Sequence, residues 1–563
     1  MNTLLSRRLA ALEDALGPIT PISTEDQAFI VLFLSWTDGS RRATVRTLTG
    51  HTTAEIWQKA HEILAPFADC ATWLRVDRVN AIERTDWKTL RTTLPDIKRN
   101  YFRLGISLDA RFTHAFLECE LNANAMLYGG PSHEGAQLNR GNFARYAAER
   151  HDLHDLDFSD RCPIWLFKTS GAFIGKDNVV HALDTTGLST GRRSMPPLRA
   201  DDTLRLITRG SRYLATQVRD DGLFHYGWHP CFDKPVDGYN CLRHASTVYA
   251  MLEAWEATRD ETVKTAIDKA LHRLTTELIR TVALPDGSSA AFLVDSGDEI
   301  KLGGNALSIL ALVKHCELTG DFRHRDLLDN LARGVRFMQD DATGGFFHVL
   351  HYPSLAIKAP FRTIYYDGEA ALSLMRLFIL TGKKCWLNMV ERACDHFIRE
   401  ERWKEHDHWL SYCVNELTMW RRHERYIKLG IDNIRNCLDF VERRITTFPT
   451  LLELMMSAEA MIARVKADPE CAHLLSGVDL ERFYDVLHYR ANYLVNGHFL
   501  PEMAMFFANP DKIEGSFFIR HQAFRIRIDD VEHYLSGLVS YRNFLISRES
   551  RQNMIRILNK ADH

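Results

Sequence analysis

The sequence predicts a mainly α-helical protein, in which a ring of six helical hairpins follows a smaller α+β region. From about Asp201 onward, apolar residues recur with a helical period, and an amphipathic helix alternates with a more uniformly apolar one. Helix pairs repeated at this scale form either an open solenoid or a closed toroid. The last pair is among the most apolar, whereas an open solenoid needs polar capping repeats at its ends. We therefore expect a closed ring.

Residues 1–195 are expected to form the α+β domain and residues 200–563 the ring. Two apolar runs on either side of Asp38-Gly39 predict a β-hairpin. The glycine- and proline-containing segment Thr186–Pro197 is the expected boundary. The expected elements of the first domain are helices at 4–16, 53–64, 87–97 and 112–127, strands at 28–34, 43–46, 73–79 and 101–108, and a hairpin of 163–167 with 171–174.

The amphipathic helices are expected on the outside of the ring, at 203–218, 262–282, 326–338, 385–398, 426–445 and 480–495. The apolar helices are expected on the inside, since a helix that is apolar on every face must be buried all round. They fall at 244–255, 306–318, 369–380, 409–420, 451–465 and 531–544. In the long loop 340–366, residues 345–350 and 361–365 predict a β-hairpin that leans over one end of the ring or packs against the N-terminal region.

The third inner helix begins Tyr365-Tyr366-Asp367-Gly368-Glu369-Ala370-Ala371-Leu372. Short turns such as Thr319-Gly320-Asp321 lead from an apolar helix to the next amphipathic one, and longer loops such as Asp221-Gly222-Leu223-Phe224 lead from the amphipathic helix to the apolar one. With six such hairpins, the chain resembles the (α/α)6 barrel of the six-hairpin glycosidases, an architecture shared by N-acylglucosamine 2-epimerases and polysaccharide lyases. The resemblance covers roughly residues 200–550 and matches no single family's full set of motifs. It implies a substrate cleft where the long loops meet the N-terminal ends of the inner helices.

The residues at these ends are carboxylates, aromatics and arginines, the groups that bind sugars and their acidic substituents. The expected catalytic residues are Asp367, Glu369, Asp529, Asp530 and His533. The expected substrate-binding residues are Trp228, Asp237, Tyr239, Arg243, His244, Asn305, Tyr365, Tyr366, His408, Trp409 and Arg527. Each has a structural alternative, because acidic residues at helix starts are commonly caps and a histidine beside them is commonly a packed, hydrogen-bonded one.

Three functions remain open. The leading hypothesis is a carbohydrate-active enzyme, a hydrolase that cleaves a glycosidic bond of an oligo- or polysaccharide with Asp367 or Glu369 paired with Asp529 or Asp530. The first alternative is a sugar epimerase or polysaccharide lyase that transfers a proton through His244, His408 or His533. The second is a non-catalytic toroid that binds a glycan or a partner in a polysaccharide-assembly system.

Composition narrows the class of protein. A formal charge of -3 over 563 residues argues against a dedicated nucleic-acid-binding protein. No stretch approaches the roughly 18 uncharged apolar residues of a membrane span, and the first residues do not resemble a secretory signal. Eleven cysteines without Cys-x-x-Cys spacing indicate reduced thiols and a cytoplasmic location. No nucleotide-binding glycine motif is present, and we expect no cofactor, a carbohydrate substrate and an undetermined oligomeric state.

His229, Cys231, Cys241 and His244 lie within 16 residues and are of the types that bind zinc. Their spacing matches no standard zinc pattern, and no second Cys-His cluster lies downstream. Buried or cleft-lining side chains are the preferred interpretation, and no metal site is predicted.

Overall fold

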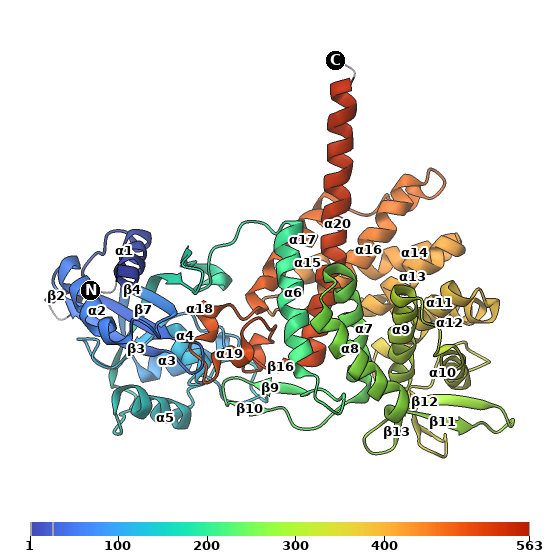
Figure 1. Ribbon diagram of the computed structural model, residues 1–563, viewed down its shortest axis with the longest axis horizontal. Coiled ribbons are helices and arrows are strands. Elements are labelled where there is room, and N and C mark those ends of the chain that lie inside the picture. The colour runs from blue at the N-terminus through green and yellow to red at the C-terminus, as the bar shows by residue number, and fades with distance from the viewer. Residues whose placement is uncertain (1–2, 25–26, 562–563) are drawn as a thin grey trace.

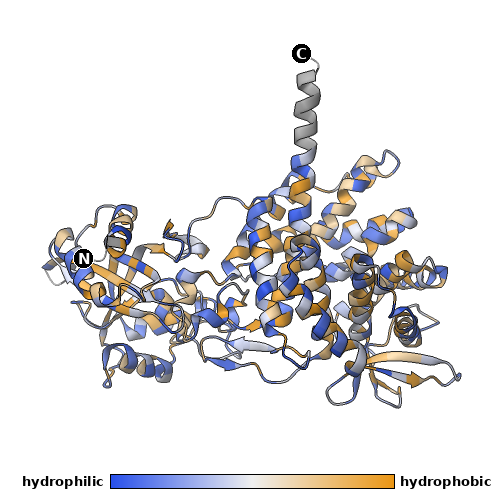
Figure 2. Ribbon diagram, viewed as in Figure 1, coloured by the Kyte–Doolittle hydropathy of each residue, from blue (hydrophilic) through white to orange (hydrophobic). Residues whose placement is uncertain are grey.

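A sheet-rich region and a helical ring lie side by side in the computed structural model, which describes residues 3–24 and 27–561 (Figure 1). Figure 2 places hydrophobic residues both on the ring helices and on the N-terminal sheet. Within the described residues, no helix combines the length and the apolar character that crossing a membrane requires.

The N-terminal region is built on an antiparallel sheet of eight strands in the order β1-β2-β4-β7-β5-β6, with β3 beside β2 and β8 beside β7. The strands are β1 (Ile22–Thr24), β2 (Gln27–Thr37), β3 (Thr44–Gly50), β4 (Trp73–Asp86), β5 (Gly105–Ser107), β6 (Ala115–Phe116), β7 (Pro163–Ile174) and β8 (Val180–Ala182). The helices are α1 (Thr3–Leu16), α2 (Thr53–Leu64), α3 (Trp87–Thr93), α4 (Glu118–Ala123) and α5 (Arg140–His151).

The hairpin predicted around Asp38-Gly39 is confirmed, since β2 and β3 pair antiparallel across it. The hairpin predicted within 163–174 is wrong, because β7 is one continuous strand paired with β4. Gly171, which suggested a turn, instead faces Asp77 on β4, and a Cβ there would lie 2.5 Å from Asp77 Oδ1. The close approach of β4 therefore accounts for this glycine.

The helix predicted at 112–127 is also wrong. Strand β6 and the short helix α4 occupy this segment, and Phe112 has a left-handed backbone with φ of 60°. A bulky residue in that conformation interrupts any helix. Helix α5 was not predicted, and the strand predicted at 101–108 is reduced to β5.

The ring of six hairpins is confirmed. The inner helices are α7 (Cys241–Thr258), α9 (Leu302–Thr319), α11 (Tyr365–Thr381), α13 (His408–Trp420), α16 (Thr450–Ala467) and α20 (Ile528–Ala561). The outer helices are α6 (Ala200–Gln217), α8 (Glu261–Arg273), α10 (Arg325–Met338), α12 (Lys384–Arg399), α14 (Glu424–Arg435) and α17 (Leu480–Tyr493). Each inner helix packs against the next, and α20 packs against both α16 and α7, which closes the ring.

Two small sheets extend the loops at one end of the ring, along its lower edge in Figure 1, while α20 projects beyond the opposite edge. The first sheet contains β9 (Gly227–His229), β10 (Lys234–Pro235) and β16 (Ile526–Arg527). The second contains β11 (Ile279–Ala283), β12 (Ser289–Asp295), β13 (Glu299–Lys301), β14 (Val349–His351) and β15 (Ile357–Ala359). The hairpin predicted in 340–366 is thus β14–β15, with shifted bounds, and it pairs with β13.

The N-terminal region contacts the segment of 497–527 that carries the helices α18 (Pro501–Ala504) and α19 (Pro510–Ile513). The amides of Arg42 and Ala43 donate hydrogen bonds to the carbonyls of Ala508 and Met505. Arg193 forms an ion pair of 2.7 Å with the fully buried Glu502. The division into domains at 195–200 remains a prediction.

Candidate functional site

A cavity of about 630 Å³ opens at the loop-bearing end of the ring. Its walls come from the first two turns of all six inner helices and from residues 519–527. This confirms the expectation that these helix ends share one mouth. The expected residues that line the cavity are Arg243, Tyr365, Tyr366, Glu369, His408, Trp409, Arg527, Asp529, Asp530 and His533.

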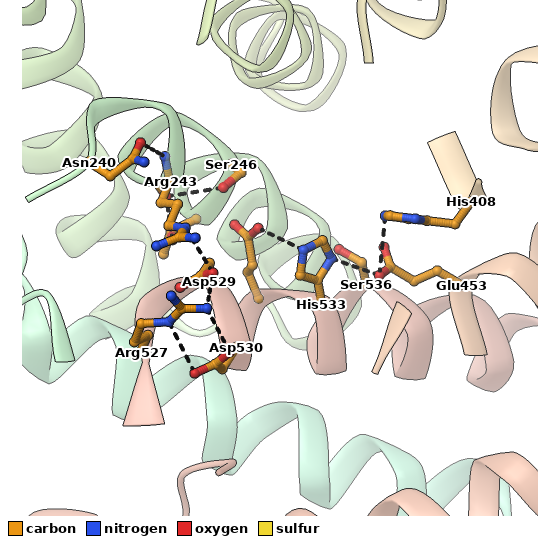
Figure 3. A network of polar contacts seen from close by, with 12 residues as sticks. Asn240, Arg243, Ser246, His408, Glu453, Arg527, Asp529, Asp530, His533 and Ser536 are labelled. Atoms are coloured by element: carbon orange, nitrogen blue, oxygen red, sulfur yellow. Dashed lines mark hydrogen bonds and ion pairs between the residues drawn. The ribbon is translucent and has the colours of Figure 1, made fainter. Parts of the chain in front are cut away.

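Two histidines and a glutamate lie together at the cavity. His533 donates a hydrogen bond from Nδ1 to Glu453 Oε2 over 2.8 Å, and His408 Nε2 lies 3.9 Å from the same oxygen. The imidazole rings of His408 and His533 stand nearly perpendicular, with centroids 5.4 Å apart. Figure 3 shows Glu453 in contact with both rings. His408 is 3% exposed, and its Nε2 has no hydrogen-bond partner among the described residues.

The surroundings displace the pKa values of the two imidazoles in opposite directions. Burial opposes a charge on His533, but Glu453, Glu532 and Asp529 outweigh it and raise the pKa of His533 to about 10. Burial, helped by the charge of His533, lowers the pKa of His408 well below its usual value. Burial also raises the pKa of Glu453. We place the shared proton on His533 because three carboxyl groups face it.

Aromatic rings border this pair. The ring of Trp409 lies 5.0 Å from that of His408 and 6.4 Å from that of His533, centroid to centroid. Tyr365 packs edge-on against His408 at 5.5 Å. An apolar face beside a polar, titratable group is the arrangement that holds a sugar ring by its C–H face.

Glu369 extends from the second turn of α11 and is 5% exposed. Burial raises its pKa to about 8, and the nearby Asp407 adds to this shift. Its Oε2 has no hydrogen-bond partner in the described part of the chain. The neutral form of Glu369 is therefore favoured at pH 7, and its Oε2 is buried beside Gly303.

Asp529 and Asp530 are held by three arginines. Asp529 Oδ2 lies 2.9 Å from both Arg243 and Arg527, and Asp530 pairs with Arg525 at 3.0 Å and Arg527 at 3.2 Å. Burial works against ionisation of Asp530, but Arg525 and Arg527 hold its pKa below the usual range. Figure 3 shows Arg243, Asp529, Arg527 and Asp530 as one connected chain. The network neutralises Arg243 and Arg527, which we had expected to bind an acidic substituent, and makes Asp530 a structural carboxylate.

Three further residues that we expected at the site are buried outside the cavity. Asp367 does not line the cavity, because its Oδ1 lies 3.3 Å from His348 and its Oδ2 lies 3.9 Å from Arg402. His244 is fully buried between the hydroxyl of Tyr239, at 2.8 Å, and the carbonyl of Ala270. Asn305 is fully buried and bonds the backbone of Leu293, Ala291 and Leu331. These side chains join elements of the ring to one another.

Trp228, Asp237 and Tyr239 also lie outside the cavity. Trp228 and Tyr239 line a second hollow of about 720 Å³ beside α6, where the Lys512 ammonium rests on the Trp228 ring. Asp237 is exposed in the loop between β10 and α7. Trp228 and Tyr239 therefore face a different hollow from the one that holds the histidine pair.

Among the described residues, one group could hold a metal ion, with ligand atoms of His408, Glu453 and His533 within 4.8 Å of one another. The 2.8 Å contact between His533 and Glu453 joins opposite charges that satisfy each other, so we interpret the group as an ion pair with a neighbouring imidazole. His229, Cys231, Cys241 and His244 form no such group. The Cys231 thiol instead donates to the carbonyl of Asn122.

The sequence analysis missed Glu532 and Arg444, and it noted Glu453 at the start of the fifth inner helix without assigning it a role. The structure places all three at or beneath the cavity. Glu453 falls in the first turn of an inner helix, and Glu532 directly precedes His533, so position could also have suggested Glu532. Arg444 lies in the short connection between α15 (Leu438–Arg443) and α16, where no sequence pattern marks it.

No protein-family model matches this sequence, and no curated protein is similar to it in sequence. In structure, the chain is similar to a D-mannose isomerase, with 10% identity over 62% of this chain and 97% of the other, and a TM-score of 0.46. It is also similar to the cellobiose 2-epimerase of Bacillus thermoamylovorans, with 9% identity over 61% and 99% and a TM-score of 0.46. An α-1,6-mannanase of Salegentibacter matches with 11% identity over 61% and 100% and a TM-score of 0.40. At these identities the likeness concerns the fold alone.

Proposed function

We propose that this protein is a carbohydrate-active enzyme that transfers a proton at a sugar carbon, as an epimerase or isomerase does, with His408 as base and His533 as acid. One observation carries the proposal: two imidazoles 5.4 Å apart at a cavity have pKa values displaced in opposite directions. Such a pair supplies a neutral base and a charged acid at the same pH, as proton transfer in both directions requires.

The ring nitrogens of His408 and His533 assign the two steps of the proton transfer. His408 Nε2 takes a proton from the carbon next to a sugar carbonyl, and the C–H electron pair becomes the C=C bond of an enediol. His533 keeps Nδ1 on Glu453, and its Nε2, which lies 3.6 Å from Glu532 Oε1, donates a proton to the carbonyl oxygen as its charge develops. Return of a proton to the opposite face of the same carbon, or to its neighbour, completes epimerisation or isomerisation.

The cavity suits a small sugar. Its volume of about 630 Å³ falls in the usual range for sites that enclose one small ligand. Trp409 and Tyr365 provide the apolar wall against which a pyranose can stack. Glu369 and Asp529 line the cavity, and each has one oxygen without a hydrogen-bond partner among the described residues, which a sugar hydroxyl could supply.

Hydrolysis of a glycosidic bond is the second candidate, supported by Glu369. A carboxyl group with a pKa of about 8 is protonated at neutral pH, as a general acid must be. The carboxylate pair expected from the sequence is weakened, because Asp367 lies outside the cavity and Asp530 is bound by two arginines. Only Glu369 with Asp529 remains available as a pair.

Deuterium exchange tests the leading proposal. Mono- and disaccharides are incubated with the protein in D2O, and incorporation at a carbon is followed by NMR. His408→Gln and His533→Gln should each slow exchange by about 10²- to 10⁴-fold. His423→Gln, at an exposed histidine on the outside of the ring, is the matched control. If both cavity variants exchange as fast as the wild type, or if oligosaccharides are cleaved without exchange, the proposal is wrong.

A further inference from the structure

We propose that the substrate is an acidic sugar and that Arg444, at the rim of the same cavity, binds its carboxylate, sulfate or phosphate group. The inference shares the cavity with the proposed function but rests on separate atoms and a separate measurement.

The argument begins with the charge pairing of the cavity arginines. Arg243, Arg525 and Arg527 are bound to Asp529 and Asp530, and Arg362 lies 3.3 Å from Glu299. In the described part of the chain, no carboxylate pairs with Arg444, which lines the cavity with them. A half-buried guanidinium that no acid neutralises attracts an anion from outside.

Arg444 is also held in one orientation. Its Nε donates to Thr446 Oγ1 over 2.8 Å, and its guanidinium lies over the rings of Phe440 and Phe448, 5.0 and 4.8 Å from their centroids. The two terminal nitrogens have no partner among the described side chains and backbone. They form a planar fork, which matches the two oxygens of a carboxylate, sulfate or phosphate. Anchoring the Nε removes much of the entropy that binding would cost.

Further positive groups surround this rim. His521 and Arg525 line the cavity beside Arg444, and the N-terminal region adds Lys98 and Arg99. Burial and the charges of these neighbours lower the pKa of His521 to about 4, so its ring is neutral and can hydrogen-bond without competing for the anion. Arg525 is paired with Asp530 and Lys98 with Glu134, so Arg444 and Arg99 are the cations of this rim that no carboxylate pairs in the described part of the chain.

The N-terminal region also fixes the position of the rim. Tyr101 donates to the carbonyl of Ile445 over 2.8 Å, and the Asn100 amide donates to the carbonyl of Arg520 over 2.8 Å. These bonds tie the segment that carries Lys98 and Arg99 to the residues on either side of Arg444 and His521. The sheet-rich region thereby contributes to recognition of the substrate.

The test measures binding, so it does not depend on turnover. Isothermal titration calorimetry compares acidic and neutral sugars that differ in one group: D-glucuronate with D-glucose, D-galacturonate with D-galactose, glucose 6-phosphate with glucose, and N-acetylglucosamine 6-sulfate with N-acetylglucosamine. We expect the wild type to bind at least one acidic member about 10- to 100-fold more tightly than its partner. The pair that shows the preference identifies which anion the site takes.

Arg444→Met should remove that preference and leave the affinity for the neutral sugar unchanged. Arg444→Lys, which keeps the charge without the fork, should retain only part of it. Arg443→Met is the matched control, because it removes the same charge from a neighbouring, 82% exposed side chain and should change nothing. The proposal is overturned if no acidic sugar binds better than its neutral partner, or if Arg444→Met, folded by its melting temperature, keeps the preference. Loss of exchange in the His408 and His533 variants with acidic binding intact would separate this site from the catalytic proposal.

Discussion

The Nδ1–H group of His533 on α20 donates to the carboxylate of Glu453 on α16 over 2.8 Å, and this contact links two inner helices beside the cavity. Glu453 is 1% exposed, so the bond lies away from solvent. In such surroundings the carboxylate strongly favours the charged imidazole. The contact sets the protonation of the proposed acid.

Glu453→Gln should change the pH dependence of proton exchange. In the wild type the acid form of His533 persists until the pH rises through about 10, so the rate of exchange should fall only there. Without the carboxylate, burial lowers the pKa of His533, and the alkaline limb should move toward neutral pH. A profile of kcat/KM between pH 6 and 11 measures the shift, and an unmoved limb would contradict the assignment.

The same pair makes a prediction about stability. The pKa of His533 is higher in the folded protein than the ordinary histidine value of about 6.5, so the ion pair contributes its full stabilisation below that pH. The contribution disappears as the pH rises through about 10. The melting temperature of wild type should therefore exceed that of Glu453→Gln at pH 6, and the difference should shrink by pH 10.5. Calorimetry at both pH values provides the measurement. A constant difference would mean that Glu453 acts only through packing.

Glu369→Gln separates the two candidate reactions. Glutamine has the shape of the protonated glutamate but cannot donate its proton as an acid, so hydrolysis should fall by about 10²-fold or more. Proton exchange through His408 and His533 should fall by much less, since Glu369 then serves only as a hydrogen-bond donor to the sugar. Both rates are measured on one disaccharide. Equal loss of both would place Glu369 in the proton-transfer step.

Arg193→Met tests the attachment of the N-terminal region. Burial opposes ionisation of Glu502, and Arg193 holds its pKa below the usual range, so removing the arginine leaves a buried carboxylate without its partner. We expect a loss of about 3–5 kcal/mol in the free energy of unfolding by urea. Arg212→Met breaks an exposed pair with Asp260 and should cost about 1 kcal/mol or less. Similar losses in the two variants would show that the buried pair contributes nothing special.

Gly368→Ala tests the packing between α11 and α13. A Cβ at Gly368 would overlap the Asp407 carboxylate and lie 2.7 Å from the amide nitrogen of Leu410. Overpacking of this kind costs about 1–3 kcal/mol. Gly141→Ala on α5, where a Cβ meets only Asn139 at 3.7 Å, should be neutral or stabilising. Urea unfolding compares the two, and a stable Gly368→Ala variant would mean that the helices can separate without cost.

The sequence predicted the fold best where burial alone decides the pattern of residues. Helices buried on every face have no polar stripe, and this pattern located all six inner helices and the closed ring. It failed where tertiary contact overrides local preference. Gly171 suggested a turn, but it lies within β7, where the close approach of β4 leaves no room for a side chain. Phe112, with its left-handed backbone, interrupts a segment whose apolar residues suggested a helix.

The site was predicted less well than the fold, because a helix start gives the position of a residue and not the direction of its side chain. His408, Trp409, Glu369 and His533 were placed correctly at the cavity. Asp367 stands only two positions before Glu369 on α11, yet this difference turns it toward His348 and Arg402. Arg243 pairs with Asp529 only because the ring brings α7 beside α20, and no local sequence pattern predicts such a contact.

Because α20 closes the ring, the ring can be completed only late in synthesis of the chain. Of the six inner helices, the ribosome releases α7 first and α20 last, so the wall between them stays open until α20 has been made. During that time the apolar sides of α7 and α16 face solvent or chaperones. Asp529, Asp530, Glu532 and His533 arrive on the same last helix that closes the ring. A chain that lacks α20 can therefore have neither a sealed ring nor a complete cavity.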